Sequence, residues 1–334
     1  MSFARNARAA LEISVPSLSR GLRAPAGKPG LTDMREGTTP NGPILIHWYE
    51  SGPIDAPLTI VYVHGFNISS QSFYNQEREL RSLGVRQLLV DVRGHGRTAA
   101  DTEQAHGPAD PALLTVDDAA DDVMAVMRDR NITGPVLVVG HSLGGPISLS
   151  LIRRYADAPD GFSLAGSVQI SSSVDPFTKR GMPRALGGHL GTGVYRLVQA
   201  APGISEAVRV GVTEALAPLL AVGFYAGHVP WEVIIFHADM IQNTPLRTYE
   251  GFFPDLREHS ERAVAEKLSG VPGYILVGEL DTVAPLEHSE ALHAVWPEAG
   301  LHVLPQSGHM PPLDAADSVT TAIIRLVRQL LPTT

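Results

Sequence analysis

The sequence predicts an α/β protein, a mostly parallel, doubly wound sheet that carries an inserted helical cap. Three observations predict this fold class. Short apolar segments alternate with amphipathic ones along most of the chain, and this alternation stops between residues 174 and 260. The apolar segment 135–142 ends in a serine that lies between two nearby glycines and leads directly into a helix-like stretch. Buried strands that alternate with amphipathic helices are typical of a parallel sheet covered on both faces.

The individual elements follow from local patterns. A helix around 70–83 ends at Gly84, a residue that readily adopts the left-handed conformation of a helix end. The helix over 115–130 begins near Thr115 and Asp118 and repeats apolar residues at intervals of three and four. Further helices are predicted over 143–156 and at the end of the chain, before Pro332. The predicted strands cover residues 44–50, 58–66, 85–96 (running into a glycine-rich loop), 135–142, 164–173, 273–278 and 301–305.

These elements divide the chain into an arm, a core and a cap. Residues 41–173 and 261–334 form the predicted core, and 174–260, helical by composition, form the cap, since a structureless loop of that length is rare in a compact protein. Residues 1–40 form an N-terminal arm, rich in arginine near its start, that we expect to be flexible or peripherally packed. A peripheral membrane contact of this arm is the alternative interpretation.

Composition excludes several classes of protein. The 334 residues include no cysteine, which removes disulfides and thiolate nucleophiles, and the net charge of −9 argues against nucleic acid as a partner. No segment approaches the ~20 apolar residues of a membrane span, and Glu12 and Pro16 interrupt the one segment that resembles a secretory signal. We therefore expect a cytoplasmic protein. The oligomeric state is not readable from the sequence.

The strongest local motif is Gly140-His141-Ser142-Leu143-Gly144, followed by Gly145. It matches G-x-S-x-G and lies between a buried strand and a helix, the setting in which a sharp turn exposes a serine hydroxyl to a base. The small residues on either side allow the following helix to pack closely. This context predicts Ser142 as a nucleophile.

Four motifs in this order resemble those of the α/β-hydrolase family, and the resemblance covers residues 42 to 331. The segment "VYVHGFN" (61–67) resembles the strand and oxyanion loop of the family, and "DVRGHGRT" (91–98) its glycine-rich turn. The segment "VGELDTVAP" (277–285) is similar to the turn that bears the acid, and "SGHMPPLDAAD" (307–317) to the histidine loop. The resemblance implies the α/β-hydrolase fold with a cap, as in its esterase- and lipase-like members.

A serine nucleophile needs a histidine base and an orienting carboxylate, which follow it in this fold in the order acid, histidine. Among the downstream histidines, only His309 follows a predicted core strand at once and lies in a glycine-containing loop. Asp281 and Glu279 both follow the strand 273–278. The spacing of the family motif, from Gly278 to Pro285, selects Asp281 as the acid.

The resemblance also implies an oxyanion hole. The backbone N–H groups of Phe66 and Leu143 would form the oxyanion hole, beside Gly65. Asn67 stands where the family often has proline. The candidate substrate-binding residues are Gly65, Asn67, His141 and Trp231, and packing under the nucleophile turn is the other interpretation of His141. His64 and His95 are interpreted as structural. No motif indicates a metal site, and no cofactor is expected.

The function predicted from these residues is hydrolysis of a carboxylic ester through an acyl-enzyme on Ser142. The cap is apolar and lacks a cluster of Arg or Lys, so we expect a largely apolar small-molecule ester as the partner. Carbon–carbon bond hydrolases, lactonases, amidases and perhydrolases keep the same triad and stay open. A ligand-binding protein of this fold with little turnover, and a membrane-associated lipase that uses the arm, are further alternatives.

Overall fold

The computed structural model describes residues 29–177, 223–227 and 229–331. They form an eight-stranded sheet in the order β1-β2-β4-β3-β5-β6-β7-β8. The β1–β2 and β2–β4 pairs are antiparallel, and the other pairs are parallel. The strands are β1 (Arg35–Asn41), β2 (Ile44–Ser51), β3 (Thr59–Val63), β4 (Arg86–Val90), β5 (Pro135–His141), β6 (Ser163–Ile170), β7 (Gly273–Gly278) and β8 (Gly300–Leu304). The predicted mostly parallel sheet is confirmed.

The strand order reverses between β3 and β5. From β3 the chain moves outward to β4 and then returns to the other side of β3 as β5. In open α/β sheets, ligands bind outside the carboxyl ends of the strands at such a reversal. The segments beginning at His64 and Ser142 follow β3 and β5 there.

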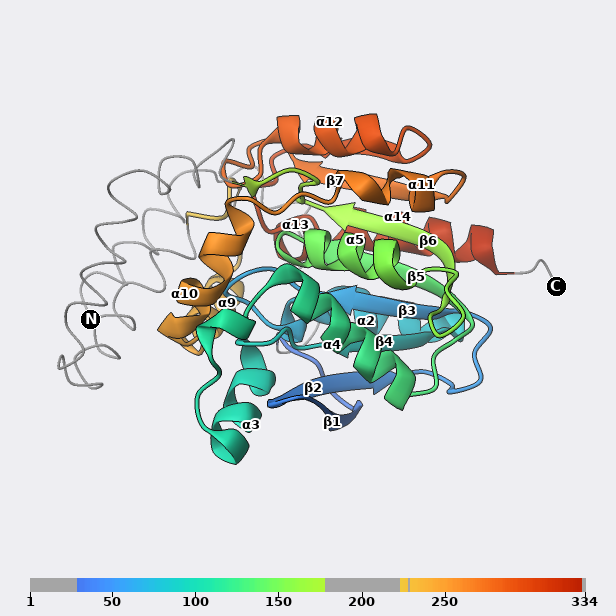
Figure 1. Cartoon of the computed structure of the whole chain (residues 1–334). Helices are drawn as coiled ribbons and strands as arrows, with labels where there is room; N and C mark the ends of the chain where they lie inside the picture. The colour runs from blue at the N-terminus through green and yellow to red at the C-terminus, as the bar shows by residue number, and fades with distance from the viewer. Residues whose placement is uncertain (1–28, 178–222, 228, 332–334) are drawn as a thin grey trace.

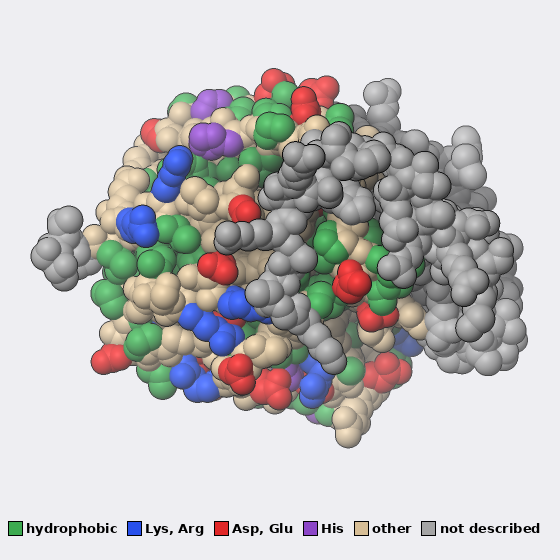
Figure 2. All heavy atoms as spheres, turned by 180° about the vertical axis from the view of Figure 1, so that it is seen from behind, with side chains coloured by type: hydrophobic (Ala, Val, Ile, Leu, Met, Phe, Trp, Pro, Cys, Tyr) green, Lys and Arg blue, Asp and Glu red, His purple; other side chains and the backbone are tan. Residues whose placement is uncertain are grey.

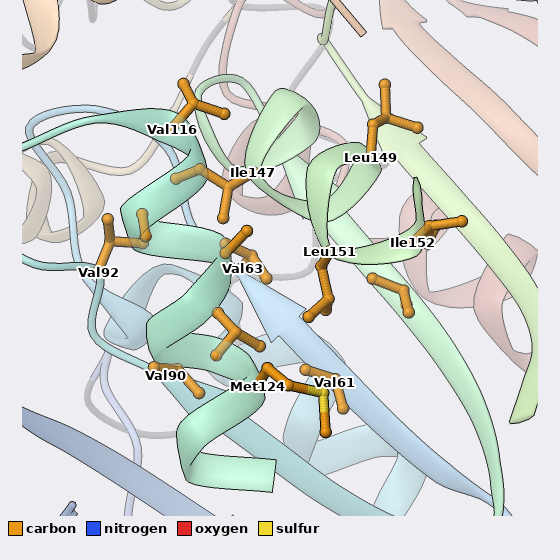
Figure 3. Close-up of a cluster of buried hydrophobic side chains, with 14 of the residues drawn as sticks. Val61, Val63, Val90, Val92, Val116, Met124, Ile147, Leu149, Leu151 and Ile152 are labelled. Carbon is orange, nitrogen blue, oxygen red and sulfur yellow. The ribbon is translucent and has the colours of Figure 1, made fainter. Parts of the chain in front are cut away.

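Helices cover both faces of the sheet (Figure 1). One face carries α4 (Val116–Asp129), α5 (Gly144–Tyr155) and α12 (Leu286–Val295), and the other carries α2 (Tyr74–Leu80) and α14 (Ala316–Leu330). Alternate residues of β3 supply the two cores: Val61 and Val63 point to the α4–α5 side, and Ile60 and Tyr62 to the α2–α14 side. Figure 3 shows the α4–α5 side of this packing. The continuous apolar strands predicted from the sequence are thus buried on both faces.

The cap is represented by two helices inserted between β6 and β7, α9 (Trp231–Gln242) and α10 (Leu246–Leu256). They lie beside the end of the sheet towards which the parallel strands point (Figure 1). The other short helices are α11 (Ala265–Leu268) and α13 (Pro311–Asp314). Residues 178–222 of the predicted cap and 1–28 of the predicted arm lie outside the described residues.

Two expectations need correction. Residues 35–40, assigned to the arm, belong to the edge strand β1, so the sheet begins earlier than the predicted boundary at 41. The helix α3 (Gly96–His106) was not predicted, because its sequence has no apolar stripe and buries only Thr98 and Thr102. The hydroxyls of these threonines accept the backbone N–H groups of His47 and Leu45 in β2, so hydrogen bonds attach this helix to the sheet.

The surface of the described residues has mixed charge. On the face drawn in Figure 2, basic side chains are interspersed with acidic ones and do not gather into one field. Within the described ranges, no helix has the length and hydropathy needed to cross a bilayer.

Candidate active site

The turn after β5 holds Ser142 in a strained backbone conformation, with φ of 52°. Its N–H donates to the carbonyl of Ile170 in the neighbouring strand at 2.9 Å. A Cβ added at Gly144 would lie 2.0 Å from the carbonyl oxygen of Val63, and one at Gly145 would lie 1.5 Å from Ser172 Oγ. The glycines of the motif are therefore required by close packing, as the sequence predicted.

Three predicted site residues form a hydrogen-bonded chain. His309 Nε2 lies 2.9 Å from Ser142 Oγ, and His309 Nδ1 lies 3.0 and 2.9 Å from the two carboxylate oxygens of Asp281. An ionised carboxylate can only accept, so Nδ1 carries the proton and Nε2 accepts the serine hydroxyl. These hydrogen bonds leave the lone pair of His309 Nε2 directed at the Ser142 hydroxyl, as general-base catalysis requires.

Asp281 is held as a carboxylate. Burial would raise its pKa, but the charge of His309, its hydrogen bond and the N–H group of Ala284 outweigh burial and lower the pKa. The N–H groups of Val283 and Ala284 each donate to Asp281 Oδ1 at 2.9 Å. The rival carboxylate, Glu279, is exposed and accepts the N–H of Gln306. Asp281 is thus the carboxylate that contacts His309.

The loop after β3 lies against the nucleophile turn. A Cβ added at Gly65 would be 2.9 Å from Ser142 Cβ. His64 holds this loop, because its Nδ1 donates to the Gly65 carbonyl at 2.8 Å while its Nε2 accepts the Val92 N–H at 2.9 Å. Burial lowers the pKa of His64 to about 4, so the ring stays neutral at physiological pH. Among the described residues, the amides of Phe66 and Leu143 have no hydrogen-bond acceptor.

Asn67 adopts φ of 60°, a conformation that proline cannot take and asparagine tolerates. A proline at this position would therefore require a different loop conformation. The Phe66 ring packs edge-on against Tyr249 of α10, with ring centroids 4.8 Å apart. The loop and the cap are therefore in direct contact beside the serine.

His141 and Trp231, two of the candidate substrate-binding residues, have packing roles in the structure, and their contact with substrate stays a prediction. The His141 ring is buried, and its Nε2 donates to the His309 carbonyl at 2.9 Å, which makes it a support of the histidine loop. Burial, with a smaller contribution from His309, lowers the pKa of His141 to about 3. Trp231 begins α9 and packs against the apolar cluster between cap and core.

A cap segment and a short helix also contact the histidine loop, and the sequence analysis assigned a role to neither contact. The His309 N–H donates to the Phe224 carbonyl at 2.8 Å, and the two rings are 5.9 Å apart. Asp314 of α13 accepts hydrogen bonds from Ser307 and Gly308. A carbonyl contact carries no residue preference, so Phe224 left no signal in the sequence; Asp314 lies within the quoted histidine-loop motif.

A group of three potential metal ligands lies away from the serine: Asp117, His259 and Glu261. The guanidinium of Arg153 hydrogen-bonds both carboxylates, at 3.0 Å from Asp117 and 2.7 Å from Glu261. A cation already balances these charges, so we interpret the group as an ion-pair network between the core and the end of the cap.

Fold and site together define the class of α/β proteins whose reactive residues follow parallel strands at the reversal of strand order. The chain belongs to the alpha/beta hydrolase family, whose model matches residues 60–322. A dihydrolipoyllysine-residue acetyltransferase component of an acetoin cleaving system from Pseudomonas putida is 22% identical over 90% of this chain and 72% of that protein. The bifunctional esterase/perhydrolase DCH of Acinetobacter calcoaceticus is 35% identical over 36% of this chain, which spans 40% of that protein's length. Among solved structures, a thermophilic esterase from Thermogutta terrifontis has a TM-score of 0.65 and 23% identity, over 90% of this chain and 99% of that one. This last likeness shows the fold.

Proposed function

We propose that this protein is a serine hydrolase that cleaves a carboxylic ester through an acyl-enzyme on Ser142. The observation that carries the proposal is the hydrogen-bonded chain from Ser142 through His309 to Asp281. It combines a strained serine, a histidine whose Nε2 accepts the hydroxyl proton, and a carboxylate that orients the ring.

In the first half of the reaction, Ser142 Oγ attacks the ester carbonyl carbon and its proton passes to His309 Nε2. The negative oxygen of the tetrahedral intermediate accepts hydrogen bonds from the N–H groups of Phe66 and Leu143. One such donor contributes ~3 kcal/mol of transition-state stabilisation. Collapse of the intermediate breaks the bond to the alcohol oxygen, which takes the proton from His309 and leaves.

In the second half, water attacks the acyl carbon while His309 Nε2 accepts its proton. The intermediate collapses to the free acid, and the proton returns to Ser142 Oγ. Asp281 stays ionised throughout and stabilises the imidazolium formed in each half.

A largely apolar substrate fits the surroundings of the serine. The rings of Phe66, Tyr249 and Phe252 pack together at the oxyanion loop, and Phe224 packs against His309. The helix α9 contains no lysine or arginine that could pair with an anionic substrate. Apolar walls with few polar groups are typical of small-molecule sites.

The first experiment is a series of p-nitrophenyl esters from acetyl to palmitoyl, with Ser142→Ala protein in parallel. We expect turnover that falls at least about 10³-fold in the variant, and labelling of Ser142 by a fluorophosphonate that the variant lacks. Absence of both would contradict the proposal. Turnover of lactones without turnover of these esters would instead favour the lactonase alternative.

A further inference from the structure

The carboxylate of Asp314 accepts two hydrogen bonds from the histidine loop. Its Oδ1 accepts the Ser307 hydroxyl at 2.6 Å, and its Oδ2 accepts the Gly308 N–H at 2.8 Å. These are the two residues immediately before His309. One carboxylate therefore bridges the loop by two hydrogen bonds, and its place is fixed by α13, whose Pro312 carbonyl accepts the side-chain amide of Gln76 from α2.

The charge of this carboxylate also acts on the imidazole of His309. Asp314 interacts electrostatically with His309, Asp281 and Tyr225. Burial raises the pKa of Asp314, although the bonds from Ser307 and Gly308 act in the opposite direction. A nearby carboxylate stabilises an imidazolium, and its protonation removes that stabilisation.

The remaining charged groups around α13 are engaged elsewhere or exposed. On α2, Glu77 pairs with Arg81, and Arg78 lies over the Tyr74 ring. On α14, Asp317 is exposed to solvent. Within the described residues, Asp281 contacts His309 directly and Asp314 interacts with it electrostatically. Burial lowers the pKa of the neighbouring His141 and His237 to about 3, so these two rings stay neutral.

We propose that Asp314 is a positioning residue for His309 and a second carboxylate that sets the pH range of activity. This inference rests on the proposed serine hydrolase function. Asp281 orients the ring by direct contact, and Asp314 orients the backbone that carries it. The charge of Asp314 favours the imidazolium formed as His309 takes the serine proton.

Three variants separate charge from geometry. Asp314→Asn removes the charge at nearly constant size, Ser307→Ala removes one hydrogen bond and keeps the charge, and Asp317→Asn removes an exposed charge three residues away. For each, kcat and KM are measured from pH 4 to 9 with the best p-nitrophenyl ester. The protonation of the His309 ring is followed in parallel by NMR, which needs no substrate.

For Asp314→Asn we expect kcat to fall about 10-fold with KM nearly unchanged. We expect the acid limb of the profile, and the NMR midpoint of the ring, to move about 0.5–1 pH unit lower. Ser307→Ala should lose several-fold in kcat with no movement of the midpoint, and Asp317→Asn should match the wild type.

A wild-type NMR midpoint in Asp314→Asn, or an equal shift in Ser307→Ala, would overturn the inference. If Asp314→Asn does not fold, the ¹³C shift of the Asp314 carboxyl in the wild-type protein decides, because a coupled pair titrates in two steps. A ¹³C titration curve of Asp314 that shows no step at the pH where His309 titrates would also overturn the inference. If the wild-type protein turns over no ester, the proposed function is rejected. The NMR titration needs no substrate and would still test the coupling of Asp314 to His309.

Discussion

Gly65 determines how closely the loop after β3 approaches the nucleophile. A Cβ at this position would lie 2.9 Å from Ser142 Cβ and 3.0 Å from His141 Nδ1, and neither neighbour can move without disturbing the turn. We expect Gly65→Ala to push the Phe66 amide away from the developing oxyanion and to lower kcat about 100-fold, with a small change in KM.

The matched control for this substitution is Gly134→Ala, since an added Cβ there meets nothing within 4 Å. Both variants should keep a wild-type melting temperature within a few degrees. Steady-state kinetics with the same ester decide the matter, and a Gly65→Ala enzyme as fast as the control would refute the role of this loop.

Side chains whose chemistry is specific were predictable one residue at a time. The hydrogen-bonded pair of Ser142 and His309 was predictable because a nucleophile and a base would need particular residue types in particular turns, and the strand pattern located those turns. Asp281 needed the spacing of the family motif, since Glu279 has the same chemistry. The support from Phe224 was not predictable, because the contact uses a backbone carbonyl, which every residue offers.

At the scale of elements, the apolar pattern predicted the strands and the helices that bury an apolar face. It failed for α3, whose contacts to β2 are made by threonine hydroxyls. The apolar pattern was equally uninformative for the segment that connects the end of α10 to the core. There, Asp255 accepts the Val116 N–H at 2.8 Å, and His259 lies 2.8 Å from Glu261. Polar contacts of this kind leave no periodic trace in a sequence.

The His259 network predicts a pH-dependent attachment of the cap. Burial alone would lower the pKa of His259, but the hydrogen bonds and charges of Asp255 and Glu261 outweigh it and raise the pKa to about 9. A raised pKa stabilises the folded state at pH values below the ordinary value of about 6.5. That stabilisation is lost as the pH rises from about 6.5 through 9. We expect about 1–2 kcal/mol after allowing for screening by solvent.

Urea unfolding of wild type and His259→Gln at pH 6 and pH 9.5 tests this attachment. The variant should be less stable at pH 6, and the difference should shrink at pH 9.5. His106→Gln, which changes an exposed histidine at the end of α3, is the control and should be neutral at both values. An equal loss at both pH values would mean that His259 acts by packing and not by charge.

At the scale of the whole molecule, the site is assembled from segments far apart in the chain. The sheet places the turns after β3, β5 and β7 and the loop after β8 at one edge, and the cap adds the backbone of Phe224. The backbone of His309 is thereby hydrogen-bonded on both sides. Its N–H donates to the Phe224 carbonyl, and its carbonyl accepts from the His141 ring. The cap segment around Phe224 therefore supports the loop that carries His309.

The substitution that tests this coupling is Gly308→Ala. Its Cβ would lie 2.4 Å from the Phe224 carbonyl oxygen and 3.0 Å from the Ala226 N, so the cap segment must move and the bond to the His309 N–H must lengthen. We expect kcat to fall about 10- to 100-fold, even with p-nitrophenyl acetate, a substrate too small to need the cap for binding. Gly134→Ala again serves as the control. A Gly308→Ala enzyme that loses activity only on long esters would show that the cap selects substrates without supporting His309. A uniform loss across chain lengths, with an unchanged melting temperature, is the result expected if the cap holds the base in place.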